Sequence, residues 1–99
     1  MRVALPTHLR TLAGVEPEVR VDLSSETPAT ARAVFDELEA RHPRLRGTIR
    51  HHDTGERRAY MRFFAGREDL SHESLDAELP EAVVRGNEAL RVVGAIAGG

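Results

Sequence analysis

The sequence contains no cysteine and no lysine among its 99 residues. Without cysteine, the chain can form no disulfide, no thiolate nucleophile and no cysteine-ligated metal site. Without lysine, all fourteen basic side chains are arginine. The N-terminal amine is then the one primary amine, and no lysine side chain can form a Schiff base or an isopeptide bond. We attribute the arginine bias mainly to codon usage in a GC-rich genome, but the chemical consequence holds whatever its cause.

Long apolar runs are also missing. No stretch approaches the roughly 20 residues that a membrane-spanning helix requires. The first residues lack the apolar core and the small-residue cleavage site of a signal peptide. The net charge is −2 and 40% of the residues are hydrophobic, which shows no bias toward nucleic acid or anionic lipid. We therefore expect a single cytoplasmic domain with a modest core and with no membrane or nucleic-acid partner.

The first third of the chain has the pattern of a β-hairpin. Apolar and polar residues alternate over 2–5, which predicts a short strand stopped by Pro6. Residues 6–14 have the apolar spacing of a helical turn that ends at Gly14. Alternation returns over 18–23, with Val19, Val21 and Leu23 on one face, and predicts a second strand.

The segment 27–41 has the strongest helical pattern. Thr27 is a suitable N-cap, and Pro28 suits the first helical position because its missing N–H leaves no bond unmade. Pro43 predicts the end of the helix, since the residue before a proline is disfavoured in the α region. One apolar stripe follows the helical period: Ala31, Val34, Phe35 and Leu38.

Two more strands are predicted in the second half. Residues 46–58 are polar and rich in turn formers, which indicates a loop. A strand is predicted over 59–66, with Met61 and Phe63 inward, because the opposite phase would bury an unpaired arginine. That phase places three side chains outside: Tyr60, Arg62 and Phe64. A last strand is predicted over 89–93, with alternate residues buried.

This order of elements favours an α+β domain of the β-grasp, ubiquitin-like type. One helix cannot be buried alone, and a mixed sheet of about four or five strands needs one face covered. We therefore expect the helix to cross the sheet diagonally, in a domain over 1–93 that is followed by a tail over 94–99. The predicted core is Val3, Leu5, Val19, Val21, Val34, Phe35, Leu38, Met61, Phe63, Leu90 and Val92, with Leu45 and Ile49 added after the helix.

The tail, GAIAGG, is made almost entirely of small residues. Its six residues reach about 20 Å when extended at roughly 3.3 Å each. Such a thin peptide can enter a narrow channel and deliver only the Gly99 carboxylate to its far end. Attack of that carboxylate on the α-phosphate of ATP would convert it into a good acyl donor. The alternative is a frayed end that happens to be small.

Four segments carry a family resemblance: VALPTHLRTLAG, TARAVFDELEARHPRL, YMRFFAGRED and ALRVVGAIAGG. Together they make the chain resemble the MoaD/ThiS family of ubiquitin-like sulfur carriers over nearly its whole length. The final Gly98-Gly99 pair is the most specific of these matches. Within the family, the chain looks most similar to the actinobacterial branch that supplies sulfur for cysteine synthesis.

The resemblance implies a carrier that is charged by other proteins. An ATP-dependent activating enzyme would adenylate Gly99, and a sulfurtransferase or another sulfur donor would form the thiocarboxylate. A downstream synthase would then pass the sulfur to a cofactor, to cysteine or to a tRNA base. Gly98 shares the reacting end, and Ile96 and Ala97 would contact the partner. The chain itself would bind no cofactor and would have no catalytic residue, acting as a co-substrate or as the small subunit of an enzyme such as molybdopterin synthase.

Two other functions fit the same sequence. A ubiquitin-like modifier would be joined through Gly99 to lysines of target proteins, by way of the same adenylate. A regulatory binding domain would keep its function when Gly98 and Gly99 are deleted.

Side chains away from the tail suggest one surface. Tyr60 and Phe64 flank Arg62 and form a candidate docking patch, since aromatic residues beside arginine are enriched at interfaces; alternatively, they pack beneath the loop over 46–58. The histidines at His51 and His52 are expected to be solvated, so no metal site is predicted. The arginines of this region are expected on a solvated or protein-facing surface: Arg44, Arg46, Arg50, Arg57 and Arg58.

Overall fold

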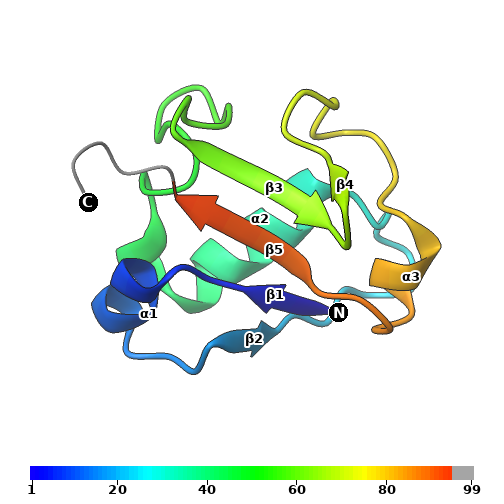
Figure 1. The fold of residues 1–99 in the computed structure, drawn as a ribbon, viewed down its shortest axis with the longest axis horizontal. Coiled ribbons are helices and arrows are strands. Elements are labelled where there is room, and N and C mark those ends of the chain that lie inside the picture. The colour runs from blue at the N-terminus through cyan, green and yellow to red at the C-terminus, as the bar shows by residue number, and fades with distance from the viewer. Residues whose placement is uncertain (95–99) are drawn as a thin grey trace.

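The computed structural model describes residues 1–94 of the chain. Five strands form one sheet in the order β2-β1-β5-β3-β4 (Figure 1). In chain order the elements are β1 (Arg2–Ala4), α1 (Thr7–Ala13), β2 (Glu18–Arg20), α2 (Ala31–Arg41), a 3-10 turn (Pro43–Leu45), β3 (Met61–Ala65), β4 (Glu68–Asp69), α3 (Glu81–Val84) and β5 (Leu90–Gly94).

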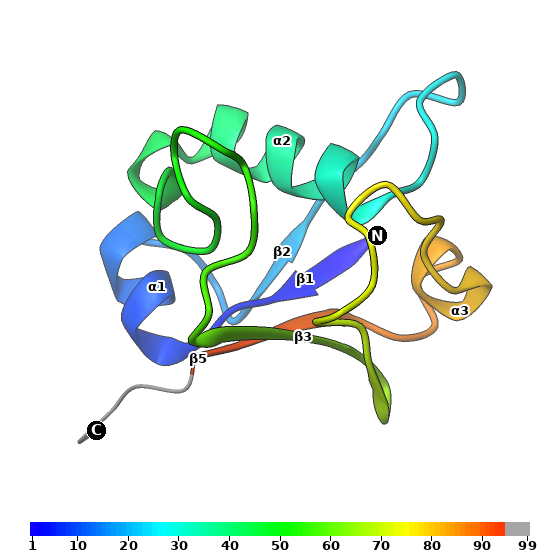
Figure 2. The ribbon, with the colours of Figure 1, turned by 90° about the horizontal axis from the view of Figure 1, so that it is seen from above.

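The sheet is mixed. β1 and β5 run parallel, and the other neighbouring strands are antiparallel, including the predicted hairpin of β1 and β2. Helix α2 crosses one face of this sheet (Figure 2). The predicted α+β, β-grasp architecture is therefore confirmed.

The core lies between the sheet and α2, and every residue predicted for it is buried. The rings of Phe35 on α2 and Phe63 on β3 meet with their centroids 4.8 Å apart, a favourable tilted contact. Leu45 and Ile49 are also fully buried, as predicted. The core also contains residues that the sequence pattern did not place there: Leu9, Ala65, Leu79 and Val83.

The start of α2 differs from the prediction. Thr30, not Thr27, is the N-cap, and its side-chain oxygen accepts a hydrogen bond from the Ala33 N–H at 3.1 Å. Thr27 instead closes a turn, with its N–H donating to the Ser24 carbonyl. Residues 29–30 stay extended because they pair with the segment that precedes α3: the Leu79 N–H donates to the Ala29 carbonyl at 2.8 Å. Tertiary pairing therefore outweighs the local signal for an earlier start.

Three short elements also differ from the sequence prediction. β2 ends at Arg20 and does not continue to residue 23 as predicted. β4 has two residues and α3 has four, and neither was predicted. Elements of this length span too few periods of a strand or helix to leave a hydrophobic pattern.

The loop over 46–58 is held by arginines that the sequence analysis placed at the surface. Arg50 is only 6% exposed, so that expectation is wrong for this residue. Its guanidinium donates to Glu39 and to Asp36 on α2, each at 2.9 Å, and its Cζ lies 5.8 Å from the centroid of the Phe35 ring. Partial burial is tolerated because each charge has a partner.

Arg57 is the second such residue. Its Nε donates to the Ser71 carbonyl at 2.8 Å, and its Nη1 donates to the carbonyl of Met61 at 2.8 Å and to those of the two residues that precede Tyr60. Arg58 donates to the Gly47 carbonyl. The loop is therefore tied to the start of β3 and to the segment after β4 by side chains that donate to backbone carbonyls, most of them partly buried.

We predict that Arg50→Ala lowers the free energy of unfolding by about 2 kcal/mol, because it leaves Glu39 unpaired and removes packing from Phe35. The predicted loss of stability is smaller than that for breaking a fully buried ion pair, since the Asp36 side chain is 63% exposed. Chemical denaturation followed by circular dichroism measures the change. Arg20→Ala is the matched control, because its pair with Asp22 is exposed and should contribute less than about 0.5 kcal/mol. Equal losses in the two variants would contradict the anchoring role.

Candidate functional site

The site starts where the described chain leaves the sheet. β5 is the central strand, hydrogen-bonded to β1 on one side and to β3 on the other, and its last residue, Gly94, pairs with Met61. Four predicted site residues lie outside the described residues: Ile96, Ala97, Gly98 and Gly99. The described structure therefore supplies the base from which the tail departs (Figure 1).

The side chain of His8 lies against Gly94. A Cβ atom on Gly94 would come 3.0 Å from His8 Cε1 and 3.6 Å from Met61 Sδ. His8 reaches this position because β1 pairs with β5 only through Val3 and Ala4, after which the chain enters α1. Glycine thus allows the first turn of α1 to pack closely against the end of β5.

A mixed aromatic and arginine surface adjoins this exit on the sheet face opposite α2. We call it the outer patch: Tyr60, Arg62, Phe64, Arg91 and Val93. Arg62 pairs with Val93, and Phe64 pairs with Arg91, across β3 and β5. Tyr60 is 45% exposed and Val93 is 38% exposed.

Three side chains were predicted to lie on the outer face of the sheet at β3. Of these, Tyr60 is open to solvent, whereas Phe64 is half-buried. The Arg91 guanidinium lies 5.4 Å from the centroid of the Phe64 ring, so Phe64 packs with Arg91 on the outer face of the sheet. The sequence analysis did not include Arg91 or Val93 in the patch. Alternation places both on this face, but only the register of β3 against β5 brings them beside Arg62 and Phe64.

Arg62 is not a free charge. It donates to Asp69 on the neighbouring strand β4, and Asp69 also accepts from the Ser71 backbone N–H at 2.8 Å. Hydrogen bonds from Ser71 and from Arg62 hold the pKa of Asp69 well below its usual range. The carboxylate is therefore charged at neutral pH and fixes the direction of Arg62, which gives the outer patch one oriented guanidinium.

Other classes of site find little support in the described part of the chain. No group of three or more His, Asp or Glu residues lies close enough to hold a metal ion within residues 1–94. The helices of the same residues are too short and too polar to cross a membrane.

Comparisons with known proteins identify the fold. No family model and no curated protein matches the chain. A solved chain of the Amycolatopsis orientalis BexX/CysO complex is similar with a TM-score of 0.75 and 25% identity, covering 99% of this chain and 98% of that one. SAMP1 from Haloferax volcanii is similar with a TM-score of 0.74 and 24% identity, covering 100% of this chain and 98% of that one. CysO from Mycobacterium tuberculosis is similar with a TM-score of 0.72 and 18% identity, covering 96% of this chain and 98% of that one.

These likenesses define the class: the protein has a β-grasp, ubiquitin-like fold over its full described length. The resemblance that the sequence indicated is confirmed in the fold, since CysO and SAMP1 are among the solved structures that are similar to this chain.

We predict that Gly94→Ala lowers the free energy of unfolding by about 1 kcal/mol in the otherwise unchanged protein, because the new methyl group must displace His8. In a His8→Ala background the same change should be neutral or stabilising by about 0.5 kcal/mol, as is usual when glycine is replaced in a strand. A double-mutant cycle measured by denaturation gives the coupling. Additive effects of the two substitutions would contradict this contact.

Proposed function

We propose that the protein is a sulfur carrier charged at Gly99. A carboxylate oxygen of Gly99 attacks the α-phosphate of ATP on a partner activating enzyme and releases pyrophosphate. A sulfur donor then displaces AMP. Sulfide-level sulfur leaves the thiocarboxylate directly, whereas the persulfide of a sulfurtransferase leaves an acyl disulfide, which a second thiol cleaves to release the thiocarboxylate and form a disulfide. A downstream synthase takes the sulfur. The ATP is bound and used by the activating enzyme, and the protein acts as a co-substrate in the cytoplasm.

The observation that carries this proposal is the combination of fold and sequence end. The fold matches a chain of the BexX/CysO complex over 99% of its length. The central strand β5 is followed in the sequence by Gly-Ala-Ile-Ala-Gly-Gly. A strand hydrogen-bonded on both sides is a rigid base for a thin peptide that must enter another protein. Two CysO neighbours favour the cysteine-supplying branch that the sequence resembles. If the carrier is instead the small subunit of an enzyme such as molybdopterin synthase, it would use the same C-terminal Gly99.

A second function is favoured by a different neighbour. One structure similar to this chain, with a TM-score of 0.72, is of small archaeal modifier protein 1 from H. volcanii. A modifier would pass its activated Gly99 carbonyl to a lysine amine of a target protein. Because this chain has no lysine, it could not build a polymer through lysines of its own copies.

The outer patch is the surface that we propose for docking to the activating enzyme, through Tyr60, Arg62 and Phe64. Arg62 pairs with Val93, the residue before Gly94, so the patch adjoins the exit of the tail. A partner held here could receive Ile96 and Ala97 in a channel and Gly99 at its ATP site. An aromatic side chain beside an oriented arginine gives such a contact its energetic centre.

Intact-mass measurement of the protein from its own cells tests the charging reaction. We expect a species heavier by the exchange of one oxygen for sulfur, located at Gly99 by fragmentation. Deletion of Gly98 and Gly99 should abolish that species without changing the circular dichroism spectrum. An unmodified carboxylate that persists with ATP, activating enzyme and sulfur donor would contradict the carrier function. Isopeptide adducts on lysines of other proteins, without thiocarboxylate, would favour the modifier.

Charge reversal tests the docking patch. Arg62→Glu should slow adenylation by about tenfold, because it removes the oriented guanidinium and places a carboxylate beside Asp69. The swapped double variant, Arg62→Glu with Asp69→Arg, restores an ion pair between β3 and β4 but keeps the wrong charge at 62. Pyrophosphate release by the activating enzyme should therefore stay slow in both variants. Recovery in the swapped variant would show that Arg62 acts only on stability.

A further inference from the structure

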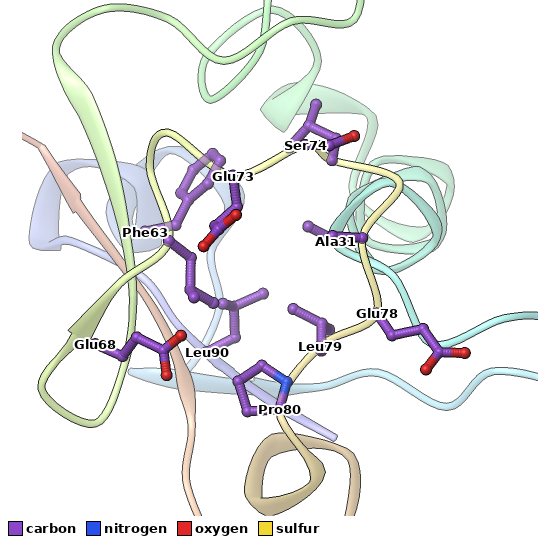
Figure 3. A pocket seen from close by; sticks show the side chains of 12 residues that line it. Ala31, Phe63, Glu68, Glu73, Ser74, Glu78, Leu79, Pro80 and Leu90 are labelled. Atoms are coloured by element: carbon purple, nitrogen blue, oxygen red, sulfur yellow. The ribbon is translucent and has the colours of Figure 1, made fainter.

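A cavity of about 250 Å³ is lined by Leu90, the first residue of β5, whereas the tail follows Gly94 at the other end of that strand (Figure 3). Core side chains form its floor: Phe63 and Leu90 are almost completely buried, and Leu79 is 8% exposed. Leu70 and Leu75, which are only partly buried, line its walls. The cavity is therefore a place where the apolar core reaches the surface without a cover from residues 1–94.

The charged side chains that line this cavity are all acidic. Glu68, on β4, and Glu73 point their side chains toward the cavity, whereas the Glu78 side chain points away from it (Figure 3). No arginine or histidine lines the cavity. Among the described residues neither Glu68 nor Glu73 forms an ion pair, and the nearby Arg32 is engaged by Asp76.

The chemistry of the walls and rim restricts what can fill this cavity. An engineered apolar cavity of about 150 Å³ holds benzene, so the present one has room for a branched or aromatic side chain. A neutral occupant that covered the rim would remove water from two carboxylates without replacing it, which is unfavourable. A cation placed beside the apolar group removes this penalty and adds charge-assisted hydrogen bonds.

We propose that this cavity is a docking site for a cationic peptide segment of a partner protein. The segment inserts one apolar side chain over Phe63 and Leu90 and places an arginine or lysine against Glu68 and Glu73. The inference goes beyond the sulfur-carrier function and does not depend on it. β5 begins at the cavity with Leu90 and ends at the tail exit with Gly94, about 13 Å away at roughly 3.3 Å per residue. A partner can therefore hold this end while another protein engages the tail.

A titration followed by amide NMR shifts tests the proposal on the complete chain, without ATP or other proteins. The probe is a capped peptide, Gly-Arg-Leu-Arg-Gly, and two matched peptides carry citrulline for arginine or alanine for leucine. We expect saturable shifts of amides around Leu70, Leu75 and Leu79, with weaker binding of both matched peptides. The double variant Glu68→Gln with Glu73→Gln should raise the Kd by about fivefold, as expected for two exposed charge pairs.

Glu78→Gln is the control, since it removes the same charge from a side chain that points away from the cavity. Its Kd should stay within about twofold of the original, and both variants should keep the circular dichroism spectrum of the parent protein. Equal weakening by Glu78→Gln, equal binding of the citrulline peptide, or no saturable shift at millimolar peptide would each overturn the proposal. Shifts of the same amides with protein concentration alone would also overturn it, because they would identify a second copy of the chain as the occupant.

Discussion

The parallel pairing of β1 with β5 is the constraint on which the rest of the structure depends. Val3 pairs with Leu90 and Ala4 with Arg91, so residues from the two ends of the domain lie side by side at the centre of the sheet. Parallel neighbours require a crossover, and α2 lies in the long connection between them and covers one face. The same pairing makes β5 an interior strand. The described chain therefore ends on the central strand of the sheet.

The loop over 46–58 between α2 and β3 is polar, and its arginines hold it in a fixed shape. Arg57 satisfies several carbonyls at once, and Arg50 bridges two carboxylates of α2 while lying near Phe35. These contacts use the planar, many-donor guanidinium, which an ammonium group on a flexible stem would not reproduce. The lysine-free composition, whatever its origin, thus has a structural use in this protein. Part of the basic charge that composition alone assigns to the surface is internal.

The features predictable from sequence were those with a repeating pattern. The alternation in β3 and β5 fixed which side chains face the core, and the apolar stripe of α2 fixed its buried face. The start of α2 was missed because Thr27 and Thr30 both suit an N-cap, and the choice depends on pairing of residues 29–30 with the segment near Leu79. Burial of Arg50 was missed for a similar reason: its partners Asp36 and Glu39 lie on another element.

The candidate site also has a part that the sequence predicts and a part that only the structure shows. Tyr60, Arg62 and Phe64 follow from alternation along one strand, whereas Arg91 and Val93 join them only through the register between two strands. The cavity brings together residues from α2, β3, β4, β5 and the segment after β4, so no local pattern could indicate it. Both surfaces nevertheless depend on β5, which contributes Val93 to one and Leu90 to the other. The central strand thus contributes its first residue to an apolar cavity with an acidic rim and a later residue to an arginine-bearing patch beside the tail exit, so the two partners that we propose would meet different surfaces of this small domain.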